Sequence, residues 1–413
     1  MNFMRLQKYL VLIFFSSISF LMGQGEPEVW VEVASLPASA SKRAESGSFT
    51  INGKGYIFGG TAAYPNWLSD CWEYDPVNDS WRQMASIPLI GPREPAFFTI
   101  GNKGYAVSGY YGSGSNSAIS KNVFEFDPVA NTWTKKADFA GNARRDAIGF
   151  SIGSKGYVGT GAISGGQISD LWEYDPSVDK WTKKANFPGN IRDAASAFSI
   201  GIKGYITLGR SATITYNDLW EYDPSLDVWI KKANFPGITR SEAVSFVIYN
   251  EAFVGSGHTS GKNDFWAYNQ FSDTWRSVTS LPGLERVEAV GFAIGEYGYL
   301  AQGYSGSLGT QKDLWKFVAY PVDNHDVKES IHFMAYPNPT TGRMIVDLQC
   351  NACNEYSVDV LNNIGERVLS LSNLHSYADL DLTFLPAGIY FVRVHYDRMT
   401  STYGEGLKKI ILK

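Results

Sequence analysis

The sequence predicts an all-β protein, in which a six-bladed β-propeller is followed by a small Ig-like β-sandwich. Three observations lead to this fold class. An aromatic residue followed seven residues later by tryptophan recurs about every 50 residues, a period typical of propellers and other repeat arrays. A second phrase, which starts at an arginine and ends in glycine, recurs between these copies. Beyond residue 318 both phrases stop, and short strand-like runs with turn signals follow, as in a sandwich.

The aromatic–tryptophan phrase predicts two antiparallel strands. In DLWEYDPSVDKW (170–181), large apolar and polar residues alternate, the chain turns at Asp-Pro, and a strand resumes at tryptophan. Alternation with a period of two indicates strands rather than a helix. The aromatic partners are Tyr74/Trp81, Phe126/Trp133, Tyr174/Trp181, Tyr222/Trp229 and Tyr268/Trp275.

The arginine phrase predicts the other two strands of each unit. RDAIGFSIGSKGYVGTG, from Arg145, reads as a strand of small residues, a tight turn and an aromatic strand that ends in glycine. Turns such as 101–104 (GNKG) suit connections that need positive φ. Each unit therefore has four strands, which make one blade.

The two ends of the repeat predict a closed ring. Trp30 opens a segment that matches the fourth strands, but no other strand of a blade precedes it. At the other end, DLWKF (313–317) matches a third strand and has no fourth strand after it. The N-terminal strand is therefore expected to complete the sixth blade, which removes the open edge between first and last units.

Over roughly residues 28–318, within a propeller domain expected to span 24–318, this pattern resembles the kelch family of β-propellers. The spaced tyrosine and tryptophan, the glycine that closes the second strand and the arginine before the first strand carry the resemblance. It implies the fold but not an activity, because function lies in sites grafted on folds.

The first 23 residues read as a cleaved secretory signal peptide. Arg5 and Lys8 form a charged region, LVLIFF (10–15) follows as an apolar core, and small residues precede Gln24. The apolar core is too short for a transmembrane helix. We therefore expect no integral membrane segment in the mature chain.

After a polar linker at 319–334, residues 335–413 resemble the C-terminal sorting domain of type IX secretion. NNIGERV (362–368), LPAGIYFVRV (385–394) and the ending KKIILK (408–413) match it. The resemblance implies recognition by the type IX secretion machinery and export through the periplasm of a Gram-negative bacterium, followed by release or attachment to the outer cell surface. An ordinary Ig-like adhesive module is the alternative. The sorting motif comprises Tyr336, Pro337, Asn338, Pro339 and Gly342.

Composition excludes several classes of function. A net charge of −5 and a pI near 5.7 leave no basic surface for nucleic acid. Three cysteines argue against a disulfide scaffold, and the Cys350–Cys353 pair lacks two further zinc ligands. Among the five histidines only His258 lies in the propeller, which excludes the copper site of galactose-oxidase-like kelch enzymes. We expect neither a metal nor a cofactor.

The candidate site is a rim of charge around the propeller axis. The loops before the first strands bring arginines, each followed closely by an acid, to one face. One interpretation is a network of buried, mutually neutralised charges. The other is a polar funnel that orients a ligand. The rim candidates are Arg43, Glu45, Arg93, Arg144, Asp146, Arg192, Arg240, Glu242, Arg286 and Glu288, next to Glu94, Arg145 and Asp193.

Two further groups of residues accompany the rim. The loops between second and third strands vary in sequence and carry aromatic residues, which suit sugar rings or peptides unless they fold back over the blades. Polar residues at the start of the third strands are expected to cap turns. The loop aromatics are Tyr64, Trp67, Tyr110, Tyr111, Tyr216 and Tyr304; the expected caps are Asp70, Asn122, Asp170, Asp218, Asp264 and Asp313.

The sequence therefore favours a secreted or surface-displayed module that binds a protein or a glycan. The alternative is a metal-independent sugar mutarotase similar to sialic-acid epimerases, since Glu242 or Glu288 beside an arginine could transfer protons. A purely structural role is a third possibility. No G-x-S-x-G or H-E-x-x-H motif is present.

Overall fold

The computed structural model describes residues 28–63, 66–112, 117–258, 263–306, 308–319, 329–330, 334–336, 338–347, 355–362, 367–374, 377–397 and 403–413. Two compact units are present, Pro27–Ala319 and Tyr320–Lys413. The predicted signal peptide (1–23), Tyr64, Pro337, both tail cysteines and most of the predicted linker lie outside the described residues. No helix in the described part is long and apolar enough to cross a membrane.

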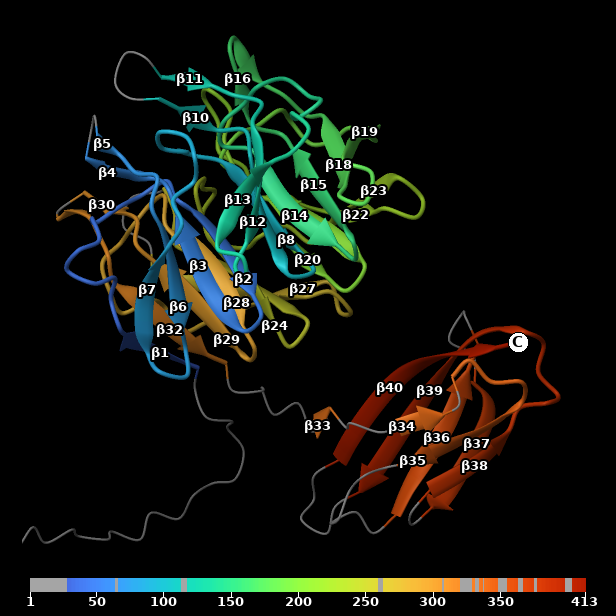
Figure 1. The fold of residues 1–413 in the computed structure, drawn as a ribbon. Helices are drawn as coiled ribbons and strands as arrows, with labels where there is room; N and C mark the ends of the chain where they lie inside the picture. Colours follow the sequence, from blue (N-terminus) through green and yellow to red (C-terminus); the bar gives the residue numbers. More distant parts are fainter. Residues whose placement is uncertain are drawn as a thin grey trace, which may run out of the picture. The chain divides into compact units, whose positions relative to one another are not determined.

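The first unit consists of six four-stranded antiparallel sheets, one for each predicted blade (Figure 1). Blade 1 has β2 (Gly47–Ile51), β3 (Lys54–Phe58), β6 (Cys71–Asp75) and β7 (Ser80–Met84). Blade 2 has β8 (Ala96–Ile100), β9 (Lys103–Val107), β12 (Val123–Asp127) and β13 (Thr132–Lys135). Blade 3 has β14 (Ile148–Ile152), β15 (Lys155–Gly159), β18 (Leu171–Asp175) and β19 (Lys180–Lys184).

Blade 4 has β20 (Ser196–Ile200), β21 (Lys203–Thr207), β22 (Leu219–Asp223) and β23 (Val228–Lys232). Blade 5 has β24 (Val244–Ile248), β25 (Glu251–Gly255), β26 (Phe265–Asn269) and β27 (Thr274–Val278). Blade 6 has β28 (Val290–Ile294), β29 (Tyr297–Ala301), β32 (Leu314–Val318) and β1 (Val29–Val33). Four short hairpins lie between second and third strands: β4 (Thr61–Ala63) with β5 (Asn66–Trp67), β10 (Tyr110–Tyr111) with β11 (Ala118–Ile119), β16 (Ala162–Ile163) with β17 (Gly166–Gln167), and β30 (Tyr304–Ser305) with β31 (Gly309–Thr310).

The N-terminal strand closes the ring, as the sequence predicted. β1 pairs antiparallel with β32, from Val29 opposite Val318 to Val33 opposite Leu314. Trp30 takes the place that the fourth-strand tryptophans hold in the other blades, and its indole N–H donates to the Thr279 carbonyl of blade 5 (2.9 Å). The prediction of six blades is confirmed.

The aromatic–tryptophan phrase joins neighbouring blades. Tyr74 lies opposite Trp81 with ring centroids 5.1 Å apart, and the tyrosine hydroxyl donates to Asp79 in the same turn (2.8 Å). The Trp81 indole donates to the Ala34 carbonyl of blade 6, while Asp79 accepts from the Ala34 amide (2.6 and 2.9 Å). Because each phrase clamps the end of the preceding fourth strand, its residues recur for a structural reason.

The second unit contains two sheets that share one core. The larger sheet has the order β33 (Glu329–Ser330), β40 (Tyr403–Leu412), β39 (Gly388–Asp397), β36 (Glu355–Leu361) and β37 (Arg367–Leu374). The smaller sheet has the order β34 (Met334–Tyr336), β35 (Arg343–Asp347) and β38 (Tyr377–Asp381). Val358, Val392 and Val346 are fully buried between the sheets, as in a sandwich.

The sorting motif packs against the C-terminal strand. Asn338 accepts the Ile411 amide (2.9 Å), and the Thr340 amide donates to the Ile411 carbonyl (2.9 Å). The backbone at Gly342 has a φ of +128°, which glycine adopts more readily than residues with a side chain. The sorting-motif segment and the C-terminal ending at 408–413, which both suggested a sorting domain, are therefore joined by hydrogen bonds.

Candidate functional site

Five of the rim arginines lie inside the blades instead of facing the axis. Arg192 is fully buried, and its guanidinium forms two hydrogen bonds to Asp218 (2.6 and 2.9 Å) and one to the Leu208 carbonyl (2.8 Å). The third-strand aspartates, which were expected to cap turns, are therefore the partners of these arginines. The pairs are Arg43/Asp70, Arg144/Asp170, Arg192/Asp218, Arg240/Asp264 and Arg286/Asp313.

Blade 2 lacks both members of this pair. Pro92 stands at the arginine position and Asn122 at the aspartate position. Arg93 is one residue further along the chain, at the position of Ala44 and Arg145, so it belongs to a different column of the repeat. The two positions change together because a buried guanidinium without its carboxylate is costly, and so is the reverse.

A ring of residues two positions after these arginines surrounds the axis. Each ring residue has a left-handed backbone, with φ between +51° and +60°. The Glu94 amide donates to the Glu45 carbonyl (3.1 Å), and the Glu242 amide donates to the Ala194 carbonyl (2.8 Å). A left-handed backbone at a residue other than glycine persists only where the surrounding structure holds it. In each blade this backbone turns the side chain of the ring residue toward the axis. The ring comprises Glu45, Glu94, Asp146, Ala194, Glu242 and Glu288, which line a cavity of about 150 Å³.

The ring corrects the sequence alignment of blade 4. Asp193 was aligned with the acids of the other blades, but Ala194 occupies that position. Asp193 lies one residue earlier, where it pairs with Arg210 (3.1 Å) and accepts from Gln167 (2.9 Å). We call the ring residues, together with the side chains that form ion pairs with them, the mouth of the propeller. Asp193 reaches the mouth from the column that holds Arg93 and Arg145.

Three arginines bind the carboxylates of the mouth. Arg93 pairs with Glu45 (3.1 Å) and Glu94 (3.0 Å). On the next blade, Arg145 also pairs with Glu94 (3.2 Å) and contacts Asp146. The pairs Arg93–Glu45 and Arg145–Glu94 cross from one blade to the next at the axis.

Arg210 is the third mouth arginine, and the sequence analysis did not single it out. It pairs with Glu242 (2.5 Å) as well as with Asp193. Its position directly follows the glycine that closes the second strand, and this column holds five different residue types in the six blades. The variation of this column within an otherwise regular repeat is the sequence signal that could have identified Arg210. The column reads Thr61, Tyr110, Ala162, Arg210, His258 and Tyr304.

Crowding of the carboxyl groups raises the pKa of several of them. Burial raises the pKa of Glu45 to about 8, and the neighbouring Glu94 and Glu288 add to the shift. The pKa of Glu288 rises to about 7, chiefly through burial and then through Glu242 and Glu94. Burial and Glu94 also hold the pKa of Asp146 well above its ordinary value. Glu45, Asp146 and Glu288 therefore hold protons near neutral pH more readily than ordinary carboxyl groups.

Replacing Glu45 with glutamine is expected to stabilise the protein above pH 8. A carboxyl whose folded-state pKa exceeds its unfolded value binds a proton more tightly in the folded state, so stability falls as the pH rises from about 4.5 to 8. The glutamine variant removes part of this fall, on the order of 1–3 kcal/mol. Urea unfolding at pH 5 and pH 8.5 measures it, with the exposed Glu32→Gln as control. If the free energy of unfolding depends on pH in the same way in Glu45→Gln and in the wild type, Glu45 does not have a raised pKa in the folded protein.

The loop aromatics divide into two groups. The Arg93 guanidinium lies over the rings of Trp67 and Tyr110, at 5.2 and 5.0 Å from their centroids, and Tyr304 is 44 % exposed. Tyr111 instead is buried in the core, and burial raises its pKa. Tyr216 is half-buried, with the Arg192 guanidinium over its ring (4.3 Å). The group at the mouth therefore consists of Trp67, Tyr110 and Tyr304.

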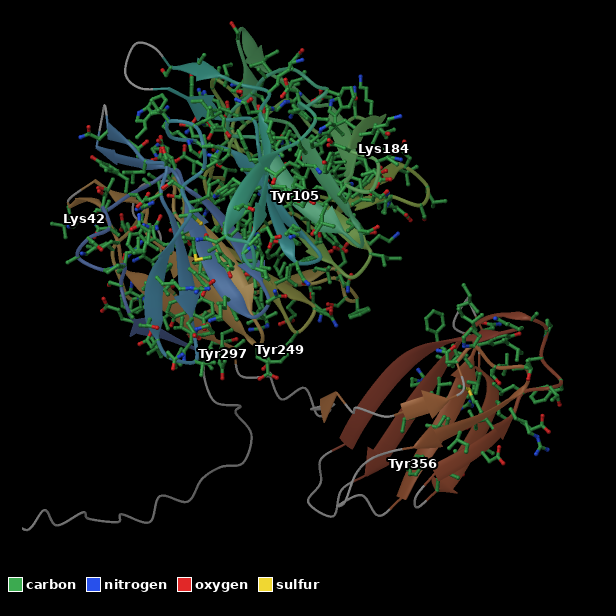
Figure 2. All side chains as sticks on the ribbon, in the orientation of Figure 1. Lys42, Tyr105, Lys184, Tyr249, Tyr297 and Tyr356 are labelled. Carbon is green, nitrogen blue, oxygen red and sulfur yellow. The ribbon has the colours of Figure 1, made fainter. Side chains whose placement is uncertain are left out.

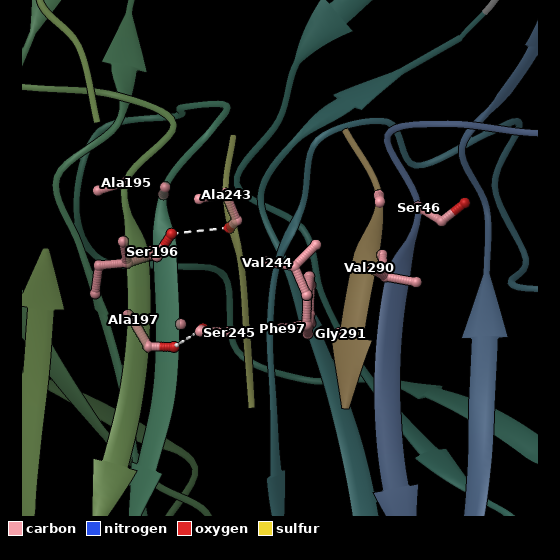
Figure 3. Close-up of a pocket in the computed structure, with 14 residues that line it drawn as sticks. Ser46, Phe97, Ala195, Ser196, Ala197, Ala243, Val244, Ser245, Val290 and Gly291 are labelled. Carbon is pink, nitrogen blue, oxygen red and sulfur yellow. Dashed lines mark hydrogen bonds between the residues drawn. The ribbon is translucent and has the colours of Figure 1, made fainter. Parts of the chain in front are cut away.

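Two further cavities, of about 200 and 280 Å³, follow the mouth cavity along the innermost strands. Adjacent cavities share lining residues, so they form one channel. Small side chains such as Ser196 and Ser245 line it and donate to carbonyls of neighbouring blades (Figure 3). Phe97 is the exception, because it lines all three cavities at a level where the other blades have serine, glycine or alanine. In the described part of the chain, no group of three or more histidine, cysteine, aspartate or glutamate side chains is arranged to hold a metal ion.

Comparisons with known proteins agree with this architecture. Residues 42–88 match the Kelch motif, and residues 334–413 match the secretion system C-terminal sorting domain. Kelch-like protein 25 of Xenopus tropicalis is 29 % identical over 123 residues, which are 28 % of this chain and 20 % of that protein. The match thus spans about a fifth of the length of that curated relative.

Among solved structures, the structure of YjhT is similar, with a TM-score of 0.59 at 16 % identity. The match covers 69 % of this chain and 97 % of that one, and it concerns the fold alone. The sorting domain indicates interaction with the type IX machinery, and secretion or attachment at the cell surface. The chain is therefore a kelch-repeat β-propeller protein that carries the C-terminal sorting domain of the type IX secretion system.

Proposed function

We propose that the propeller is a ligand-binding module for a protein or a glycan and that the mouth is its binding site. One observation carries the proposal: charged and aromatic side chains that break the repeat gather at the mouth. Arg93 and Arg145 share one column and Arg210 stands in another, and the remaining blades have residues of other types in both columns. The repeated arginine–aspartate pairs, by contrast, lie inside the blades, and the repeated aromatic–tryptophan phrases join neighbouring blades. Variable loops on a rigid scaffold are the usual place for recognition.

The chemistry of the mouth suits a polar ligand of either class. Carboxylates accept hydrogen bonds from hydroxyl or ammonium groups, and arginines bind carboxylates or hydroxyls. Arg93 is held in place by Trp67, Tyr110 and two carboxylates, so little side-chain entropy remains to be lost on binding. The exposed Tyr304 offers a flat apolar surface beside these groups.

Replacing Arg93 with alanine is expected to weaken ligand binding at least about tenfold, which corresponds to about 1.4 kcal/mol. The full chain is applied to glycan and peptide arrays, and affinities of the hits are then measured for the wild type, Arg93→Ala and Trp67→Ala. Arg82→Ala is the matched control, because its side chain is 64 % exposed and pairs with Glu73 on the outer strands. If every hit binds Arg93→Ala and Trp67→Ala as tightly as it binds the wild type, the mouth is not the binding site.

A sugar mutarotase is the second candidate function. The pKa of Glu288, about 7, and that of Glu45, about 8, lie near the working pH that general acid–base catalysis requires. Both carboxyls line the mouth cavity. Glu242, the other expected base, is engaged by Arg210.

Anomerisation of N-acetylneuraminate, followed by NMR, separates the two functions. An enzyme accelerates the interconversion, and Glu288→Gln or Glu45→Gln abolishes the acceleration while the fold is retained. Rates that equal the uncatalysed rate, or that survive both substitutions, would eliminate the catalytic role of these carboxyls.

A further inference from the structure

Three exposed isoleucines lie in the loops of blades 4 and 5 that lead to the mouth. They are Ile191, Ile214 and Ile238, with 50, 57 and 51 % of their surfaces exposed. We call these three residues the shelf. Exposed apolar residues that cluster beside a polar site are typical of interaction surfaces, whereas isolated ones are common and carry no meaning.

Hydrogen bonds connect the shelf to the mouth. Thr215 pairs with Arg210 in an isolated β-bridge, and its hydroxyl donates to that of Thr239 (2.8 Å). Ile214 and Ile238 directly precede these two threonines, so the two isoleucines belong to loops that are joined at this point. The shelf thus begins beside Arg210, which pairs with Glu242 in the mouth.

The third shelf residue is fixed by the buried arginine of blade 4. Ile191 precedes Arg192, whose guanidinium lies over the ring of Tyr216. Tyr216 follows Thr215 in the chain. The shelf residues are therefore presented by segments that ion pairs, a bridge and a ring contact hold in place, which lowers the entropy lost on binding.

We infer that the shelf and the mouth form one docking surface for a protein segment that places an apolar side chain on the shelf and a lysine or arginine in the mouth. The inference rests on the proposed function and selects one of its two ligand classes.

The apolar half of the surface favours a protein over a glycan. Sugar rings pack on flat aromatic rings and satisfy their hydroxyls with polar groups. Branched aliphatic side chains supply neither feature, while they fit the apolar side chains of a peptide. The aromatic group of Trp67 and Tyr110 lies on blades 1 and 2, so a ligand that reached the shelf would extend beyond it.

The charge of the mouth favours a basic partner. Among the described residues at the mouth, carboxylates outnumber guanidinium groups by six to three. Burial and mutual repulsion leave Glu45, Asp146 and Glu288 holding protons near neutral pH. A cation brought into this partly buried site stabilises their ionised forms, so complementary charge favours a basic partner over an acidic one. The carboxylates are Glu45, Glu94, Asp146, Asp193, Glu242 and Glu288, and the guanidinium groups are those of Arg93, Arg145 and Arg210.

Selection of random short peptides displayed on phage, with the full chain immobilised, tests the inference. The selected peptides are expected to share a lysine or arginine within a few residues of a large apolar residue. The best peptide, made synthetically, is expected to bind at least about tenfold more weakly to the Ile214→Ser/Ile238→Ser double variant.

Ile202→Ser provides the matched control and is expected to bind like the wild type. Ile202 is 70 % exposed and lies in the β20–β21 turn of blade 4. Tyr249, in the corresponding turn of blade 5, and Tyr297, which begins β29 after the corresponding turn of blade 6, lie at the end of the propeller away from the short hairpins (Figure 2). A serine at Ile202 thus repeats the chemical change away from the shelf.

Three outcomes would overturn the inference. They are selection of acidic peptides, no selection, and a peptide affinity that is the same with and without the shelf isoleucines. A glycan hit that requires Arg93 but not the shelf would also overturn it, while leaving the mouth as the binding site. If Arg93→Ala changes no interaction of either class, the proposed function itself fails.

Discussion

Replacing Asp218 with alanine is expected to destabilise the propeller by about 3–5 kcal/mol. The change leaves the fully buried Arg192 without its carboxylate, and only backbone carbonyls remain as acceptors. A charge left unpaired in the interior carries most of its desolvation cost. The same loss is expected for Asp170→Ala, which removes the partner of Arg144.

Urea unfolding followed by tryptophan fluorescence measures this loss in the propeller alone, since all 12 tryptophans lie between residues 30 and 315. Asp138→Ala is the control, because this aspartate is 63 % exposed and pairs with Lys135 at the surface. Its loss should stay below about 1 kcal/mol. An Asp218→Ala variant as stable as the control would show that the buried pairs do not hold the blades.

Replacing Trp30 with alanine is expected to cost about 3–5 kcal/mol, the range for truncation of a buried tryptophan. The indole packs against Phe265 and Phe317, each with ring centroids 4.9 Å away, and is only 8 % exposed. The change also removes the hydrogen bond to Thr279 that ties blade 6 to blade 5. Closure of the ring therefore depends on this side chain.

The same unfolding measurement tests this expectation, with Val31→Ala as control because Val31 is 43 % exposed on the same strand. Removing Trp30 weakens the pairing of β1 with β32, so the free edge of β32 is expected to promote association. Equal stability of the two variants would mean that the N-terminal strand does not close the ring.

Much of the fold could be predicted because the residue pattern that forms the four strands recurs from blade to blade. The alternation in DLWEYDPSVDKW sets two strands, and the unmatched Trp30 and DLWKF segments indicate one split blade. The structure confirms the split blade through the register of β1 and β32. The domain boundaries proposed from composition remain predictions, although the compact units divide at Ala319–Tyr320.

The partners of the arginines could not be predicted from spacing alone. Arg192 and Asp218 lie 26 residues apart, and acids much nearer in sequence seemed suitable partners. Blade 2 indicates the pairing, because Pro92 replaces the arginine and Asn122 replaces the aspartate in the same blade. Comparison of columns within the repeat would have linked the two positions.

The residues around the axial cavity lie on the loops that the sequence analysis named, but which of them line it could be predicted only in part. Glu45, Asp146 and Glu288 were named as rim residues, and they do line the axial cavity. Arg210 could not be found from the repeated arginine column, because it lies in the variable column that follows the glycine of the second strand and reaches the ring carboxyls from there. A one-residue shift between Asp193 and Ala194 changes which side chain points inward, and only the left-handed backbone reveals it.

A crystal structure of the protein with its tightest peptide or glycan ligand tests most directly whether the side chains that break the repeat form the binding site. We predict that the ligand contacts Arg93 and Trp67 at the axial mouth. A ligand bound only to the outer strands or to the turns at the opposite end of the propeller would contradict this prediction.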